Sequence, residues 1–392
     1  MTTASSGASN KPAAAEATTE AVSEALRGLT GAPKLGWVFS SPKHDLVTVM
    51  SAARAAAPGC ELFAAHTAGE FTERGAMRGG VVVLLLASDS LMFQTAVAAH
   101  LSVDPEAAAA ALTRDFAALA KDASSRGLGL STTVLLLDGL TGVGEQLVQG
   151  IRNGTRLFQQ IVGGAAGDDG QFKATAVAGG EHVGVDSAVL AHIFDKRAWG
   201  VGLDHGLRPA TPRMTVTKGS GSIISKLDGR PAFEVYREYA KTKGVELTPA
   251  TSGAFFIANE LGVYFLDGVH HARAPVGVGE NGELHLIASI SEGASVCILD
   301  GEPDAMIEAC TRAAKQARQN VGEGPVAGVL VFDCICRGMI LGRDFQKEID
   351  AVRSVFPKVP VAGFLTYGEI ARFRGRNEGW HNTTSVVVAI PA

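Results

Sequence analysis

Residues 361–370 read VAGFLTYGEI, an apolar run that ends in a glycine and a carboxylate. Residues 62–71 read LFAAHTAGEF and residues 161–169 read IVGGAAGDD, which repeat this form. An internal repeat restricts the fold more strongly than any single residue does. The three segments therefore predict a recurring strand that ends in a tight corner, and they mark the corners as places where a ligand could sit.

Two of the three segments share an upstream landmark. Residues 104–106 (DPE) and 302–304 (EPD) each place a proline at the first position of a predicted helix, where its missing N–H costs no hydrogen bond. Both landmarks are followed by a helix, a strand, a second helix and then the repeated strand. The first segment has no such start upstream. The pattern therefore predicts two full units and a leading partial one.

Strands alternate with helices along the chain, which predicts a fold between α/β and α+β. Thr133–Leu137 is a continuous apolar run, typical of a strand that is covered on both faces. Other strands are paired through short turns, so part of each sheet is expected to be antiparallel. We therefore expect internally duplicated, mixed-sheet halves that are packed by helices.

The composition excludes several classes of protein. The 392 residues include 46% apolar residues, carry a net charge of -5 and contain no Lys/Arg block, which argues against a nucleic-acid partner. No apolar run reaches the ~18–20 residues of a membrane-spanning helix, so no membrane partner is expected. The five cysteines and the absence of a secretory signal predict reduced thiols and a cytoplasmic location. Residues 1–32, rich in Ala, Ser, Thr and Glu, are expected to be a disordered leader.

The corner carboxylates of Glu70, Asp168 and Glu369 allow two interpretations. A carboxylate after a buried strand can accept hydrogen bonds from loop amides, or it can face a ligand at the strand end. Arg337 follows an apolar strand and allows the same choice: it binds a ligand anion, or it forms an ion pair with Glu369 or Asp333. Tyr367 is expected to stack on a ligand or to donate a hydrogen bond to it.

The histidines are scattered and form no metal-binding motif. His205 and His66 are the first and second candidates for an axial ligand if haem is bound, and otherwise they are polar loop residues. Catalytic motifs are absent: there is no P-loop, no G-x-S-x-G and no strand-coupled G-x-G-x-x-G. No catalytic residue is therefore nominated, and an enzyme of unknown reaction remains only an alternative.

Several motifs together resemble those of the FIST domain family. The C-terminal motifs are residues 336–338, 361–371 and 381–384, and the N-terminal ones are residues 163–168, 206–209, 214–218 and 228–232. The resemblance covers nearly all of the chain. It implies an N-terminal FIST domain at residues 33–232 and a C-terminal FIST domain at residues 233–392.

The resemblance also implies a function. FIST proteins are regarded as intracellular ligand sensors, and some resemble haem proteins that sense nitric oxide. We therefore expect a small-molecule sensor for signal transduction, with the ligand between the halves or at the corners. A histidine kinase or a cyclic-di-nucleotide signalling protein is the expected separate partner, and the cofactor, haem included, stays open. The expected ligand-binding residues are His66, Glu70, Asp168, His205, Arg337, Tyr367 and Glu369.

Overall fold

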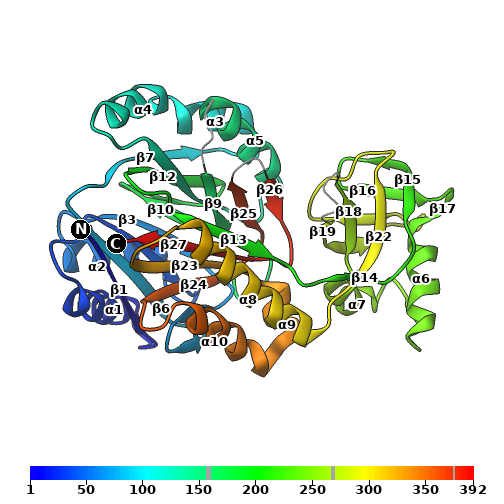
Figure 1. Ribbon diagram of the computed structural model, residues 1–392. Coiled ribbons are helices and arrows are strands. Elements are labelled where there is room, and N and C mark those ends of the chain that lie inside the picture. The colour runs from blue at the N-terminus through cyan, green and yellow to red at the C-terminus, as the bar shows by residue number, and fades with distance from the viewer. Residues whose placement is uncertain (156–159, 266–269, 374–375) are drawn as a thin grey trace.

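The chain is described by a computed structural model that covers residues 1–155, 160–265, 270–373 and 376–392. Figure 1 shows a large body, which contains both ends of the chain, and a smaller lobe, which is formed by its middle. The chain leaves the body after β13 (Gly200–Asp204) and returns to it at α8 (Pro303–Asn320). The lobe is therefore an insertion in the body.

The body consists of three units with the same order of elements. The first contains β1 (Thr2–Ser9), α1 (Ala14–Gly28), β2 (Leu35–Ser40), α2 (Leu46–Ala56), β3 (Glu61–His66), β4 (Glu70–Thr72), β5 (Gly75–Met77) and β6 (Val81–Ser88). The second contains β7 (Met92–Ala99), α3 (Pro105–Thr113), α4 (Phe116–Ser125), β8 (Leu130–Leu137), α5 (Gly144–Thr155), β9 (Gln160–Ala165), β10 (Val177–Gly179), β11 (His182–Gly184) and β12 (Ser187–Asp195). The third contains β13, α8, β23 (Val326–Cys334), α9 (Ile335–Leu341), the short 3-10 helix Gly342–Phe345, α10 (Gln346–Val355), β24 (Val361–Thr366), β25 (Glu369–Phe373), β26 (Arg376–His381) and β27 (Ser385–Pro391).

The units exchange hairpins, which closes the body into a ring. The strand orders of its sheets, over the described residues, are β1-β6-β2-β3-β10-β11, β7-β12-β8-β9-β25-β26 and β13-β27-β23-β24-β4-β5. In each sheet one central pair is parallel (β2/β3, β8/β9 or β23/β24) and the other neighbours are antiparallel. The outer hairpin of each sheet belongs to another unit. The mixed α/β fold predicted from the sequence is confirmed, and its repeat occurs three times.

The predicted disorder at residues 1–32 is wrong, and the first unit is complete. Strand β1 pairs along its whole length with β6, and α1 packs against it with Ala21 and Val22 fully buried. A side chain at Gly7 would place its Cβ 2.0 Å from the Ala21 carbonyl oxygen, so the contact needs small residues. The small residues that suggested a disordered composition are the ones that let the helix approach the strand closely.

The helix starts predicted from proline are confirmed. α3 begins at Pro105 and α8 begins at Pro303, and the Asp104 carboxylate accepts a hydrogen bond from the Ala107 amide at 2.8 Å. The first unit has α1 in the corresponding position. α1 has no proline in its first turn, so it lacks the landmark that α3 and α8 share.

The inner faces of the sheets share one apolar core. Trp37 of β2 meets Trp199, beside β13, edge-on at 6.3 Å between ring centroids, and Phe39 meets Phe364 of β24 at 4.6 Å. Aromatic pairs of this kind bury large apolar areas and fix the sheets relative to one another. Among the described residues, no helix combines the length and apolar composition needed to cross a membrane.

The lobe has its own sheet and core. Its elements are β14 (Arg208–Pro209), β15 (Met214–Ser220), β16 (Ile223–Leu227), β17 (Arg230–Pro231), α6 (Ala232–Thr242), α7 (Ser252–Ala258), β18 (Leu261–Tyr264), β19 (His270–Arg273), β20 (Pro275–Val278), β21 (Leu284–Leu286) and β22 (Ser295–Asp300). Tyr236 and Phe256 of the two helices pack edge-on in this core at 5.2 Å between ring centroids. This separate core makes the lobe a compact unit beside the body.

Candidate functional site

The three repeated corners, residues 66–70, 165–169 and 365–369, meet at one end of the body. Parallel strands of the three sheets end there, and the backbones join in a closed ring of hydrogen bonds. The N–H to O=C pairs are Ala68 to Leu365 (2.9 Å), Leu365 to Gly69 (2.8 Å), Ala165 to Gly368 (2.8 Å), Tyr367 to Ala165 (3.1 Å), Gly167 to His66 (2.9 Å) and Asp169 to Thr67 (3.1 Å). The three repeated segments of the sequence therefore form the junction at which the sheets meet.

Glu70 and Glu369 have equivalent positions in two corners. Each carboxyl accepts a hydrogen bond from the threonine three residues earlier, Thr67 or Thr366, and both glutamates are at most 1% exposed. Burial raises the pKa of Glu70 to about 8 and raises that of Glu369 well above its usual value. Glu70 also accepts a hydrogen bond from the Gly80 amide and Glu369 accepts one from the Thr384 amide, so both carboxyls are bound within the protein, and their ligand role stays a prediction.

The pKa of Asp168 is shifted in the opposite direction from the pKa values of Glu70 and Glu369. Burial alone would raise its pKa, but the hydrogen bonds from the Tyr367 hydroxyl and from the amides of Ala174, Lys173 and Phe172 outweigh this and lower the pKa. The amide distances are 2.8 Å from Phe172, 2.6 Å from Lys173 and 3.0 Å from Ala174. Asp168 therefore stays ionised and holds the loop that follows its corner.

Arg337 lies in the first turn of α9 and is completely buried. It forms ion pairs with Asp333 at 3.0 Å and with Glu348. Its remaining N–H groups donate to backbone carbonyls, those of His205 and Met306 at 2.8 Å and that of Thr383 at 3.2 Å. These bonds occupy the guanidinium, so Arg337 braces α8, α9 and α10. The pair with Asp333 is one of the two ion pairs predicted from the sequence, and a ligand role for Arg337 stays a prediction.

The two histidines proposed as haem ligands are both engaged. His205 Nδ1 accepts from the Leu207 amide at 2.9 Å, so its Nε2 donates to the His270 carbonyl at 3.0 Å. His66 Nε2 pairs with the His44 carbonyl at 3.1 Å. An axial ligand needs a free ring nitrogen on a pocket wall. His205 therefore does not fit the role of haem ligand that the resemblance suggested.

Two cavities of about 480 Å³ each take their walls from both the body and the lobe. We call the more apolar of the two, which Tyr367 lines, the interlobe cavity. Its body wall includes Leu140, Phe172, Cys334, Cys336, Met339, Tyr367 and Asn382, and its lobe wall includes Ile257, Ala274, Val276 and Ile287. Tyr367 is the predicted ligand-binding residue that lines it. The Tyr367 ring stacks on Phe172, with ring centroids 4.5 Å apart and planes at 16°.

Asn382 is the polar group of the interlobe cavity that sequence reasoning missed. It is 1% exposed, and its Oδ1 accepts a long hydrogen bond of 3.5 Å from the Ala274 amide. Its Nδ2 group has no hydrogen-bond partner among the described residues. Asn382 belongs to one of the motifs that suggested the family, but nothing in the sequence shows that the lobe would leave its amide facing a cavity.

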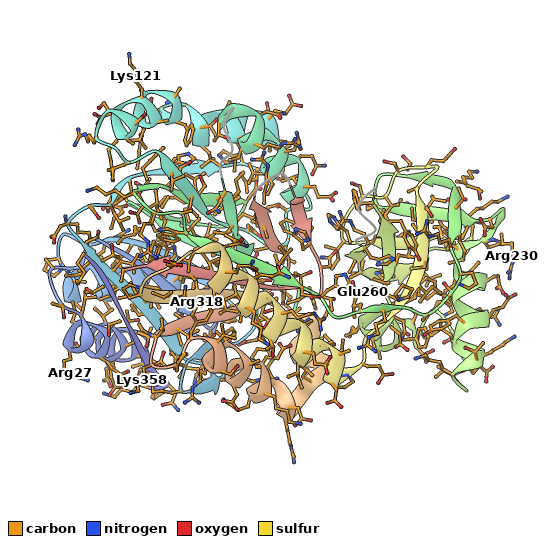
Figure 2. The ribbon with its side chains drawn as sticks, in the orientation of Figure 1. Arg27, Lys121, Arg230, Glu260, Arg318 and Lys358 are labelled. Carbon is orange, nitrogen blue, oxygen red and sulfur yellow. The ribbon has the colours of Figure 1, made fainter. Side chains whose placement is uncertain are left out.

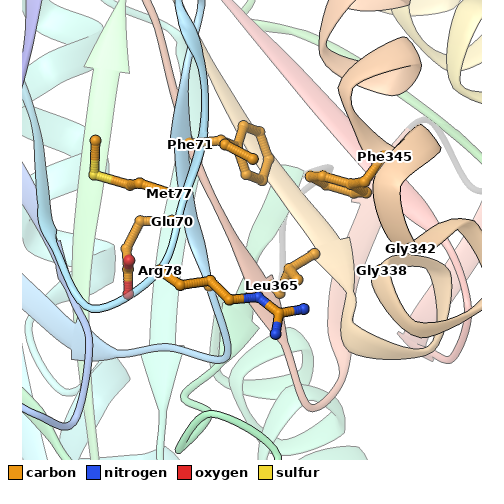
Figure 3. Close-up of a pocket in the computed structure, with 10 residues that line it drawn as sticks. Glu70, Phe71, Met77, Arg78, Gly338, Gly342, Phe345 and Leu365 are labelled. Atoms are coloured by element: carbon orange, nitrogen blue, oxygen red, sulfur yellow. The ribbon is translucent and has the colours of Figure 1, made fainter.

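A smaller cavity of about 240 Å³ lies beside the first corner. Figure 3 shows Glu70 on one side of it, and Arg78 extending across it toward Leu365. Phe71 and Phe345 meet at its back with ring centroids 5.5 Å apart. The corner thus brings Glu70 to a cavity wall, although its carboxyl remains hydrogen-bonded to Thr67.

Body and lobe are also joined by polar contacts. Glu145, at the start of α5, forms an ion pair with Arg273 of the lobe at 3.0 Å and accepts hydrogen bonds from Ser289. Glu260 lies on the side of the lobe that faces the body (Figure 2) and accepts a hydrogen bond from Thr383. Burial raises the pKa of Glu260 to about 8. These contacts hold the lobe against the body.

Comparison with known proteins supports the resemblance. Residues 34–230 match the FIST N domain and residues 232–372 match the FIST C domain, which together cover nearly the whole chain. A Methanocaldococcus jannaschii protein described as uncharacterized protein MJ1623 is 26% identical over 209 residues, 50% of this chain and 40% of its own length. The chain thus matches less than half of that relative. FIST domains are associated with sensory signal transduction, and by both matches the chain belongs to the FIST family.

Proposed function

We propose that this FIST protein is a sensor whose ligand is a compact, mainly apolar molecule bound in the interlobe cavity. The main support is that a mainly apolar cavity of about 480 Å³ takes walls from both body and lobe. Small-molecule sites are typically concave, mostly apolar and of about 300–1,000 Å³, with a few placed polar groups. The interlobe cavity has this size and this composition.

Exposed apolar side chains gather around the cavity. Leu140, Phe172, Val276, Ile287 and Met339 all line it, and their exposed fractions lie between 36% and 58%. Large apolar side chains left in water carry a cost of roughly 25 cal/mol per Å². A ligand that covers them recovers this free energy, which favours an apolar ligand over a charged one.

Asn382 supplies selectivity in this proposal. Its Nδ2 group is a hydrogen-bond donor to which the described residues offer no acceptor, and it belongs to a mainly apolar wall, where an unpaired amide is unfavourable. A ligand with a carbonyl oxygen would satisfy the donor, whereas a hydrocarbon would leave it unpaired. We therefore expect the ligand to carry one acceptor oxygen on a compact apolar frame.

The signal in this proposal is a change in the position of the lobe. A ligand can shift this equilibrium only if it binds one arrangement better than another. The interlobe cavity meets that condition because its shape depends on how lobe and body pack. The expected receiver is a histidine kinase or a cyclic-di-nucleotide signalling protein, and the five free cysteines support a reducing, cytoplasmic location.

Thermal unfolding with cyclohexanone, a compact ketone, tests the proposal. We expect a concentration-dependent rise in Tm by mass action. Val276→Asp, which puts a charge in the cavity wall, should abolish the rise. Val185→Asp is the matched control, because Val185 is 60% exposed and Val276 is 58% exposed, and Val185 does not line the cavity. An equal rise in both variants, or none in the wild type, would contradict the proposal.

A further inference from the structure

Among the five cysteines, Cys336 combines partial exposure with a position in the wall of the interlobe cavity. Cys297 and Cys310 are buried, and Cys60 is half-buried in another part of the body. Cys334 and Cys336 both line the interlobe cavity, and of these two Cys336 is the more exposed. The cavity therefore presents one accessible thiol to whatever enters it.

The other thiols are held in the unreactive form. Burial raises the pKa of Cys60 to about 12 and also raises the pKa values of Cys297 and Cys310. The pKa of Cys334 is raised by burial first and then by its contact with Cys336. Because the thiolate is the nucleophile, these four cysteines are poor sites for addition.

We propose that Cys336 adds to α,β-unsaturated carbonyl compounds that enter the interlobe cavity, with Asn382 binding the carbonyl oxygen. This inference rests on the proposed function, because it identifies the ligand of the same cavity as a reactive one. Three features support it: an apolar cavity that admits a neutral alkene, a thiol in its wall, and the Asn382 amide in the same wall, whose Nδ2 has no hydrogen-bond partner among the described residues. Together they make a covalent sensor site for soft electrophiles.

The reaction balances without an oxidant or a second reactant. The Cys336 sulfur attacks the β-carbon, so a C–S bond forms while the C=C π bond breaks. The electron pair moves to the carbonyl oxygen as an enolate, and the Asn382 Nδ2–H donates to that oxygen. Water accepts the thiol proton and returns a proton to the α-carbon, which restores the carbonyl. The net change is addition of S–H across the double bond.

The test compares 2-cyclohexen-1-one with cyclohexanone, its saturated analogue. After incubation with the full-length protein, mass spectrometry of intact protein and of peptides should show one enone adduct, on Cys336. We expect Cys336→Ser to reduce the rate of adduct formation at least tenfold, and Cys60→Ser to leave it unchanged. Cys60 is the matched control because it too is half-buried, but outside the cavity.

A separate substitution tests whether Asn382 binds the carbonyl oxygen of the enone. Asn382→Asp keeps an acceptor for the Ala274 amide but removes the Nδ2 donor. We expect it to slow enone addition at least tenfold and to slow labelling of Cys336 by iodoacetamide, which reacts by displacement, much less, because the added charge affects the thiol toward both reagents. Equal slowing with both reagents would overturn the carbonyl-binding role.

The experiments can contradict the proposal of a ligand site and the proposal of covalent addition independently of each other. If cyclohexanone raises Tm but the enone adds to Cys60 as fast as to Cys336, the ligand site stands and the covalent inference is wrong. If the enone adds to Cys336 while cyclohexanone leaves Tm unchanged, the thiol site stands and reversible binding of an apolar ketone is wrong. Enone addition that is no faster at Cys336 than at the same cysteine in the urea-unfolded chain also overturns the covalent inference.

Discussion

The hydroxyl of Tyr367 donates a hydrogen bond to the carboxylate of Asp168, although the two residues are 199 positions apart in the sequence. The bond joins the second and third corners of the ring. The same hydroxyl accepts a hydrogen bond from the Gly170 amide at 3.0 Å. In the loop that follows, Asp169 and Phe172 have φ values of 56° and 53°, a conformation that side chains seldom adopt. Tyr367 therefore holds a strained loop, and with it Phe172, at the edge of the interlobe cavity.

Tyr367→Phe tests this relationship. The substitution keeps the ring that stacks on Phe172 but leaves the ionised Asp168 without one donor. Hydrogen bonds to charged groups contribute about 1.5–3 kcal/mol, so we expect the free energy of unfolding in urea to fall by about that amount. The control is Tyr236→Phe, because the Tyr236 hydroxyl is buried without a hydrogen-bond partner among the described residues. That variant should be as stable as the wild type or slightly more stable, and an equal loss in both would remove the special role of Tyr367.

Glu70→Gln should change how stability depends on pH. The folded carboxyl has a pKa of about 8 because it is buried, above its ordinary value of 4.5. Its contribution to stability is therefore fully present below about pH 4.5 and is lost as the pH rises to about 8. Glutamine does not ionise, so the variant should lose less stability over this interval, by up to about 1.4 kcal/mol per pH unit.

The measurement for Glu70→Gln is urea unfolding at a series of pH values. Glu260 and Glu369 also have raised pKa values, so the wild-type slope should be reduced by this variant and not removed. Glu106→Gln, at an exposed position on α3, is the control and should leave the slope unchanged. A Glu70→Gln slope equal to that of the wild type would show that Glu70 is ionised in the fold.

Elements that depend on interactions between residues close together in the chain could be predicted from the sequence, whereas pairings between distant residues could not. Apolar runs placed β2 at Leu35–Ser40 within its observed bounds, and prolines placed the starts of α3 and α8, because these signals are local. The first unit was missed because its helix lacks the proline that marks the starts of α3 and α8, and because it packs through alanine. The exchange of hairpins, such as β4 pairing with β24, depends on residues far apart in the chain, and no local pattern encodes it.

The site was predictable only in part for the same reason. The corners were found because they repeat, and Tyr367 does line the interlobe cavity. Arg337 was expected at the end of a strand, but it lies on α9 and is surrounded by carboxylates from two elements. Asn382 and Cys336 became candidates only when the insertion of the lobe placed a second wall opposite them. Such a wall results from tertiary structure and has no sequence motif of its own.

Arg337→Lys tests whether this arginine has a structural role. Lysine keeps the charge but cannot reproduce the forked hydrogen bonds to Glu348 and the carbonyls. Because the charge is kept but several buried hydrogen-bond acceptors lose their donors, we expect a loss of about 1–3 kcal/mol in urea unfolding. Arg126→Lys is the control, because its pair with Asp122 is solvent-exposed and should contribute less than about 1 kcal/mol. A variant that keeps wild-type stability but no longer responds to cyclohexanone would instead favour a ligand role for Arg337.

Glu145→Ala should loosen the lobe from the body. The carboxylate pairs with Arg273, which is 7% exposed, and also accepts hydrogen bonds from Ser289, so its removal leaves a buried guanidinium without its partner. We expect a loss of about 1–3 kcal/mol in stability. Small-angle X-ray scattering should show a larger radius of gyration, because the chain crosses between body and lobe at only two places among the described residues.

Glu181→Ala is the control, since Glu181 is 96% exposed in its pair with Arg54. A loss of stability with an unchanged scattering profile would mean that Glu145 supports local structure alone, and that the lobe is held in place by the apolar contacts of the interlobe cavity.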